Sequence, residues 1–161
     1  MTSKLSPTSM RLRECEVLYR ARTVDVCVRH IRCSEDAYRL LGAMQAPARA
    51  TESVWVLLLD ARAKLIGVHE CARGGITSAR VQVGDVFRAA LVAGAPSILL
   101  AHNHPSGDCT PSPEDFAFTT AVRKAGQLLG VNVLDHVVIA CSGFYSFVDA
   151  GHMKPLQDQD V

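Results

Sequence analysis

The chain has 161 residues, of which 48% are hydrophobic and 20% are charged, and its formal net charge is +1. This length and composition are those of a soluble globular protein with one domain. The near balance of charge argues against a broad surface for binding nucleic acid. Arginines are concentrated in the N-terminal fifth of the chain, and we interpret them as a solvated segment, with a local basic patch as the alternative.

The cysteine pattern indicates a reducing compartment. The six cysteines form no C-x-x-C pair, and several lie inside apolar runs, where cysteine acts as a small buried hydrophobe. The sequence also shows no signal-peptide pattern and no apolar run near 18 residues. We therefore expect a cytoplasmic protein that does not enter a membrane.

The N-terminal part is predicted to be an extension, residues 1–29, that is partly disordered. Its first ten residues are small and polar, and short apolar alternations predict one or two strands within residues 15–31. Ser34 is predicted as the N-cap of a helix that runs to about Met44, with two acids in its first turn.

The middle of the chain begins with a loop at residues 45–53. Residues 54–60 and 65–72 are apolar runs joined by a short turn, and they predict a β-hairpin. Residues 83–95 carry apolar side chains at helical spacing, with Gly94 placed to end the helix.

The last part is predicted to contain a buried strand at residues 97–102, a helix and two final strands. Ser112 has the features of an N-cap, and Gly130 ends the helix. Residues 131–141 and 143–150 predict a strand pair. The order α-β-β-α-β-α-β-β indicates an α/β fold, a mixed β-sheet with flanking helices, over a domain of residues 30–153 with a tail at 154–161.

Three residues of the sequence "LAHNHPSGDCTPSPED" have the chemistry of a metal site. His102 and His104 are two residues apart at a strand end, with Asn103 as the spacer, so both imidazoles project to the same side. Asp115 lies in the first turn of the following helix, and the loop between can bring it back toward the histidines. Two imidazoles and one carboxylate suit Zn²⁺, and three protein ligands are typical of a catalytic zinc site.

Two further residues are candidates for catalysis. Glu70, on the second hairpin strand, is predicted to be the base that takes a proton from the attacking water. Ser112 is predicted to stabilise an oxyanion. Each has a purely structural alternative: Ser112 and Asp115 fit a capping box, and Glu70 fits an ordinary strand residue that faces solvent.

The spacing His102-x-His104-x(7)-Ser112-x(2)-Asp115 resembles the JAMM motif of the JAB/MPN+ metallopeptidases. The flanking sequences "AGQLLGVNVLDHVVI" and "GFYSFVD" are similar to those of the RadC branch, and the resemblance covers about residues 30–150. It implies a cytidine-deaminase-like fold, one zinc ion on the two histidines and the aspartate, and Glu70 as the acid/base.

The chain departs from the RadC pattern at Cys109, where the family loop has proline, and we interpret this thiol as an exposed loop residue. RadC proteins also carry an N-terminal region that resembles helix-hairpin-helix units, and we expect this chain to lack it. Asp135 and His136 are interpreted as a structural pair, with support of the metal ligands as the alternative.

The resulting hypothesis is a zinc-dependent hydrolase with a peptide, isopeptide or amide substrate. The alternatives are a DNA-repair-associated DNA-binding factor or nuclease and a non-catalytic MPN interaction module. The letters His-Asn-His do not indicate an HNH nuclease, because the residues of that motif are not consecutive. A homodimer is kept open as the assembly.

Overall fold

The computed structural model describes residues 28–74 and 81–154. Three predicted features lie wholly or partly outside these residues: the frayed start, most of the N-terminal strand region, and residues 155–161 of the tail. Within residues 28–31, His30 forms an isolated antiparallel bridge with Lys64.

The described elements follow the predicted order and form a mixed sheet, so the structure confirms the α/β fold class. They are α1 (Ser34–Ala43), β1 (Ser53–Leu59), β2 (Leu65–Arg73), α2 (Val83–Ala93), β3 (Ser97–Asn103), α3 (Pro113–Leu129), β4 (Asn132–Ala140) and β5 (Gly143–Ser146). The strand order is β2-β1-β3-β4-β5. The β3–β4 pair is parallel and the other pairs are antiparallel.

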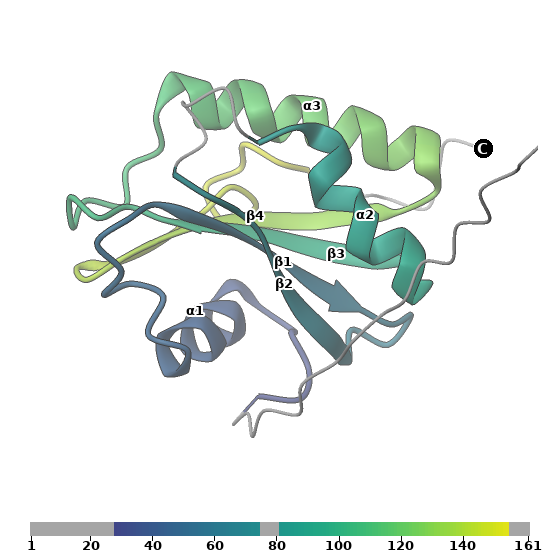
Figure 1. Cartoon of the computed structure of the whole chain (residues 1–161), viewed down its shortest axis with the longest axis horizontal. Coiled ribbons are helices and arrows are strands. Elements are labelled where there is room, and N and C mark those ends of the chain that lie inside the picture. Colours follow the sequence, from purple (N-terminus) through teal and green to yellow (C-terminus); the bar gives the residue numbers. More distant parts are fainter. Residues whose placement is uncertain (1–27, 75–80, 155–161) are drawn as a thin grey trace, which may run out of the picture.

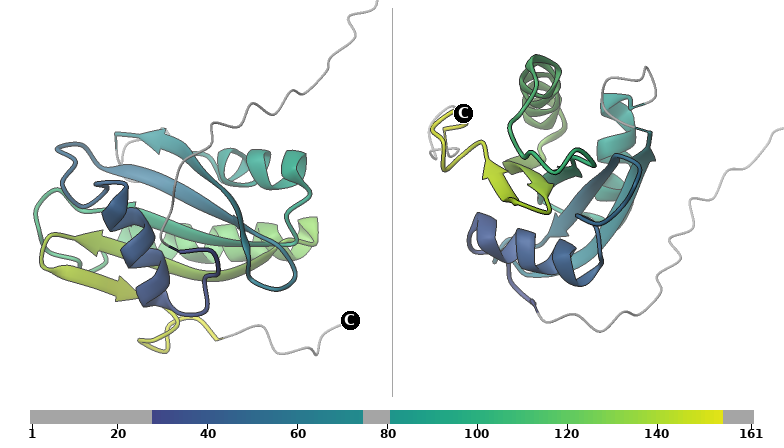
Figure 2. Two further views of the ribbon diagram at one scale, coloured as in Figure 1. Left: turned by 90° about the horizontal axis from the view of Figure 1, so that it is seen from below. Right: turned by 90° about the vertical axis from the view of Figure 1, so that its left-hand side faces the viewer.

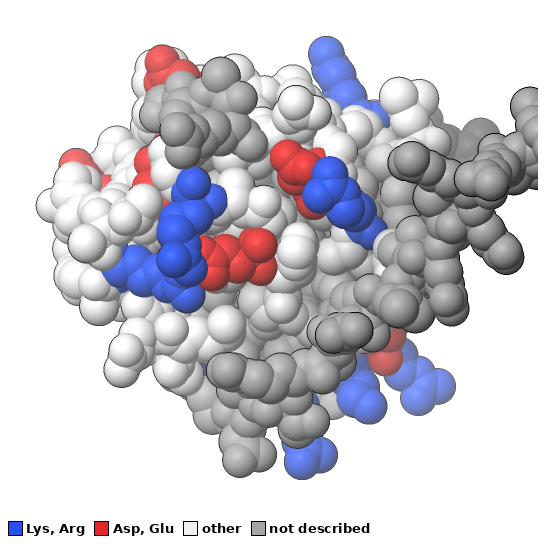
Figure 3. All heavy atoms as spheres, viewed as in Figure 1, with Lys and Arg blue, Asp and Glu red and all other residues white. Residues whose placement is uncertain are grey.

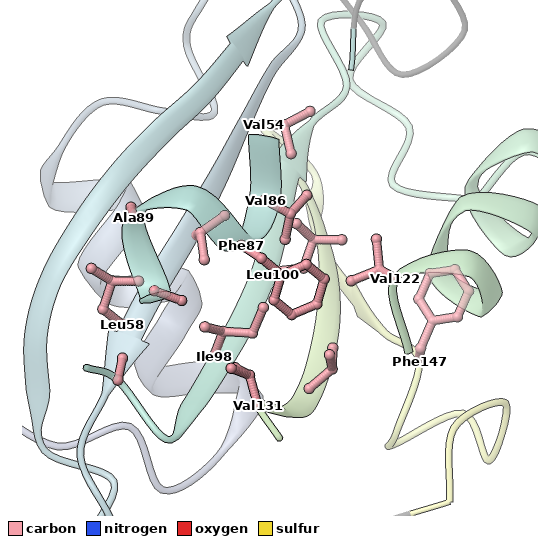
Figure 4. Close-up of a cluster of buried hydrophobic side chains, with 14 of the residues drawn as sticks. Val54, Leu58, Val86, Phe87, Ala89, Ile98, Leu100, Val122, Val131 and Phe147 are labelled. Carbon is pink, nitrogen blue, oxygen red and sulfur yellow. The ribbon is translucent and has the colours of Figure 1, made fainter. Parts of the chain in front are cut away.

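The sheet separates two layers of helices, with α1 on one face and α2 and α3 on the other (Figures 1 and 2). Every residue of β1 and β3 is buried because both faces of these central strands are covered. One core cluster lies between the sheet and the pair α2 and α3 (Figure 4). A second cluster lies between the sheet and α1.

The helix ends agree with the prediction except at α1. Its N-cap is Cys33, and Ser34 is the first helical residue, with its hydroxyl 2.5 Å from Oδ2 of Asp149. Gly94 and Gly130 end α2 and α3 in the left-handed conformation, at φ of 63° and 68°.

Helix α3 approaches the chain that enters β4 very closely at Gly126. A Cβ atom at this position would lie 2.5 Å from the carbonyl oxygen of Val131 and 2.9 Å from Cγ2 of Val133. Glycine is therefore required here for packing, and this contact fixes the height of α3 over the sheet.

Among the described residues, no helix is both long and apolar enough to cross a membrane. On the face shown in Figure 3, basic side chains lie beside acidic ones and form no continuous basic surface.

Candidate metal centre

The two histidines and the aspartate meet where β3 ends and α3 begins. His102 lies in β3, His104 follows the strand directly, and Asp115 is at the third position of α3. His102 is fully buried, Asp115 is 2% exposed, and the side chain of His104 is 17% exposed. The structure thus brings the three predicted ligands together in a nearly dry place that opens at His104.

The donor atoms of the three side chains lie close together, and one atom from each side chain can be chosen so that all lie within 4.8 Å of one another. Nε2 of His102 lies 3.0 Å from Nε2 of His104 and 3.3 Å from Oδ1 of Asp115, and Nε2 of His104 lies 3.6 Å from Oδ2 of Asp115. Two ligands of a tetrahedral zinc ion, each about 2.1 Å from the metal, lie about 3.4 Å apart. Among the described residues, this is the group of histidine, cysteine and acidic side chains that could hold a metal ion.

The backbone and hydroxyl of Ser112 hold Asp115 in place. Oδ2 of Asp115 accepts hydrogen bonds from the backbone N–H of Ser112 at 2.7 Å and from its hydroxyl at 2.8 Å, which completes the capping box. Burial raises the pKa of Asp115, but contacts with His102 and His104 outweigh it, so this carboxyl titrates well below its usual range.

The predicted oxyanion role of Ser112 is not supported by this hydrogen-bond pattern. A hydroxyl has one proton, and that of Ser112 goes to Asp115. The structure therefore shows Ser112 holding the carboxylate of Asp115, in agreement with the capping alternative.

The loop after β3 orients His104. Nδ1 of His104 lies 2.8 Å from the carbonyl oxygen of Asp108, which can only accept, so Nδ1 carries the hydrogen and Nε2 faces the cluster. A hydrogen bond with Asp115 raises the pKa of His104, and the charge of Glu52 adds to the effect. Cys109, in the same loop, is half-buried against the core, whereas we interpreted it as an exposed loop residue.

Behind His102 lies a third imidazole, that of His136, which is fully buried. Nδ1 of His102 is 2.8 Å from Nε2 of His136, and Nδ1 of His136 is 2.6 Å from the hydroxyl of Thr119. Complete burial lowers the pKa of His136 well below the usual value, which favours the neutral form of the ring. His136 thus contacts His102 directly. The preceding residue, Asp135, instead accepts a hydrogen bond from the hydroxyl of Ser146.

The structure does not bring Glu70 to the cluster, so it gives no support to the predicted role of Glu70 as the base. Glu70 lies opposite Trp55 in the β1–β2 ladder, and Trp55 belongs to the core under α1. His102 lies opposite Val54, which belongs to the core under α2 and α3. Because directly opposite residues share a face of the sheet, Glu70 and His102 project to different faces.

Glu52 directly precedes β1, and its charge acts on His104, but it was not among the predicted site residues. Val54 pairs with His102 in the antiparallel β1–β3 ladder. Glu52 is two residues before Val54 and His104 is two residues after His102, so extending the antiparallel pairing beyond β1 and β3 brings these two residues toward each other, and the charge of Glu52 raises the pKa of His104. An acid at the start of an apolar strand was the available signal, but its meaning depends on which strand lies beside it.

Asn103, predicted as a mere spacer, fixes the backbone on both sides of Glu52. Its side-chain oxygen accepts from the N–H of Ser53 at 2.7 Å, and its amide nitrogen donates to the carbonyl oxygens of Arg49 and Thr51 at 3.3 and 3.4 Å. The residue between the two histidines therefore connects the end of β3 to the start of β1.

Comparisons with known proteins find a matching family model and many similar sequences. A family model described as RadC-like JAB domain matches residues 31–152. A UPF0758 protein of Flavobacterium johnsoniae is 37% identical over 133 residues, which are 82% of this chain and 58% of that protein. A UPF0758 protein of Carboxydothermus hydrogenoformans is 45% identical over 95 residues, 59% of this chain and 42% of that protein. A UPF0758 protein of Thermotoga maritima is 39% identical over 102 residues, which are 63% of this chain and 46% of that protein. The chain spans about half the length of the curated relatives it matches.

Proposed function

The chain belongs to the family of RadC-like JAB domains, and from this premise we propose that it is a zinc-dependent hydrolase that cleaves an amide bond in a peptide, isopeptide or smaller amide. The observation that carries the proposal is the convergence of His102, His104 and Asp115, each of which offers one ligand atom, with these atoms all within 4.8 Å of one another. A cluster of two imidazoles and one carboxylate is the donor set of many catalytic zinc sites.

His102 and His104 would hold the ion through Nε2, and Asp115 through Oδ1, because Oδ2 is occupied by Ser112. A bound zinc ion supplies a Lewis acid that polarises a carbonyl group and lowers the pKa of water. The side chains that orient the ligands are Ser112 for Asp115 and the Asp108 carbonyl group for His104.

Glu52 is proposed as the group that moves the proton. It takes a proton from the attacking water as the new C–O bond forms, and it returns that proton to the leaving nitrogen as the C–N bond breaks. Its charge acts on His104, at the partly exposed side of the cluster, which suits this task, and the side chain of Asn103 holds the backbone on either side of it.

The test is hydrolysis of fluorogenic peptide and isopeptide substrates by the zinc-loaded protein, with Glu52→Gln and Glu70→Gln as a matched pair. The proposal predicts turnover in the wild type and in Glu70→Gln, with loss in Glu52→Gln. Equal rates in the wild type and a His104→Ala variant would show that the observed hydrolysis does not come from this site.

A further inference from the structure

We propose that His136 is a positioning residue which, together with Thr119, keeps Nε2 of His102 free of hydrogen and so able to bind a cation. The inference rests on the zinc site proposed above, and it concerns the direction of a chain of hydrogen bonds. That chain runs from the backbone of α3 through two side chains to the metal ligand.

The hydroxyl of Thr119 sets the direction. Its oxygen lies 2.5 Å from the carbonyl oxygen of Asp115, one turn earlier in α3, and 2.6 Å from Nδ1 of His136. A carbonyl oxygen can only accept, so the single hydroxyl proton of Thr119 points to Asp115. Thr119 must then accept the hydrogen bond from His136, and Nδ1 of His136 carries a hydrogen.

This assignment determines the state of the next ring. A neutral imidazole has one N–H and one lone pair, so His136 presents a lone pair at Nε2. Nδ1 of His102, 2.8 Å away, therefore donates its hydrogen to His136. The remaining nitrogen of His102, Nε2, has a free lone pair and is the atom that faces His104 and Asp115.

The ring of His136 is held so that it cannot turn away. It is fully buried, and it stacks on Phe147 with ring centroids 5.0 Å apart and planes 11° apart. His136 also lies in β4 beside Leu100 of β3, so the two histidines are carried by paired strands. The chain of hydrogen bonds from Thr119 through His136 to His102 is therefore held by the sheet and by the first two turns of α3.

The direction matters because the reverse chain would block the metal. If His136 donated from Nε2, Nδ1 of His102 would accept, and the hydrogen of His102 would sit on Nε2, inside the cluster. A merely structural hydrogen bond would be satisfied by either direction. Only a requirement for a lone pair at Nε2 distinguishes them, and partners of this kind around metal ligands typically change metal affinity 10- to 100-fold.

The matched pair Thr119→Val and Thr119→Ser tests the inference. Valine keeps the branched shape but removes the acceptor for His136, whereas serine keeps the hydroxyl. We expect ¹⁵N NMR of the zinc-free wild type and of Thr119→Ser to show a hydrogen on Nδ1 of His102 and none on Nε2. In Thr119→Val, we expect the hydrogen to shift toward Nε2 and zinc affinity in a chelator competition to fall about 10- to 100-fold.

A His136→Phe variant, which retains an aromatic ring above Phe147, is expected to lose zinc affinity to a similar degree. Should that variant fail to fold, the Thr119 pair decides the matter alone. An Nε2–H tautomer of His102 in the zinc-free wild type, or unchanged tautomer and zinc affinity in folded Thr119→Val, would overturn the inference. Failure of the wild type to bind zinc would instead refute the proposed function, because the NMR measurement reads the chain of hydrogen bonds without metal.

Discussion

Nη1 of Arg49 lies 2.8 and 2.9 Å from the two carboxylate oxygens of Glu70, and Nε of Arg73 lies 2.9 Å from one of them. Burial raises the pKa of Glu70, but Arg73, Ser53 and Arg49 together outweigh it and lower the pKa. A carboxylate held by two guanidinium groups is a poor proton acceptor. Glu70 thus ties the edge strand β2 to the loop before β1.

The two glutamates are therefore predicted to respond differently to the same substitution. Glu52→Gln removes the proposed proton acceptor without removing a metal ligand, so we expect bound zinc to be unchanged and turnover to fall about 10²- to 10⁴-fold. Glu70→Gln is expected to keep both zinc and turnover. Steady-state kinetics with metal analysis of each variant checks this, and an active Glu52→Gln would exclude Glu52 as the base.

Asn103→Ala is predicted to loosen the segment around Glu52. The N–H of Ser53 would lose a 2.7 Å partner inside a buried environment, which costs about 1–3 kcal/mol of unfolding free energy. We expect this loss in urea unfolding, lower turnover, and zinc binding within a few-fold of the wild type. The exposed Asn132→Ala serves as control, and equal stability of the two variants would contradict the role of Asn103.

The zinc-free protein is predicted to show a pH dependence that comes from His104. The pKa of His104 is raised, first by its hydrogen bond with Asp115. Its contribution to stability is then fully present below the unfolded pKa, about 6.5, and is lost as the pH rises through the folded pKa. The difference in unfolding free energy between the wild type and His104→Gln should shrink over that interval. NMR can follow the titration of His104 directly. A pKa of His104 at or below the unfolded value would be inconsistent with its hydrogen bond to Asp115.

Two glycine-to-alanine substitutions in helices are predicted to have opposite effects. Gly126→Ala forces a Cβ atom to 2.5 Å from the carbonyl oxygen of Val131, and such overpacking costs about 1–3 kcal/mol. At Gly42, in α1, nothing lies within 4 Å of the added atom, so alanine should stabilise by up to about 1 kcal/mol. Thermal unfolding checks both, and a neutral Gly126→Ala would show that α3 can shift away from β4.

The sequence predicted the element order because each strand and helix here has a strong local signal. Ser112 and Gly130 mark both ends of α3, and the apolar runs of β1 and β3 match their complete burial. The cluster of His102, His104 and Asp115 was also predictable, because these residues are close in the chain.

The position of the acid was not predictable, because it depends on contacts between distant strands. Glu70 lies in β2 and Glu52 directly precedes β1, and only the ladder pairing shows that Glu70 and His102 project to different faces. For the same reason, the contact of His136 with His102, 34 residues apart, requires the parallel β3–β4 pairing and the placement of α3 over it.

Zinc titration into the metal-free protein, followed by calorimetry, tests the central claim most directly. We predict saturable binding of one equivalent per chain, and its loss in His102→Ala, His104→Ala and Asp115→Ala variants that remain folded. Absence of saturable binding in the wild type, or binding that these three variants leave unchanged, would contradict the proposed metal centre.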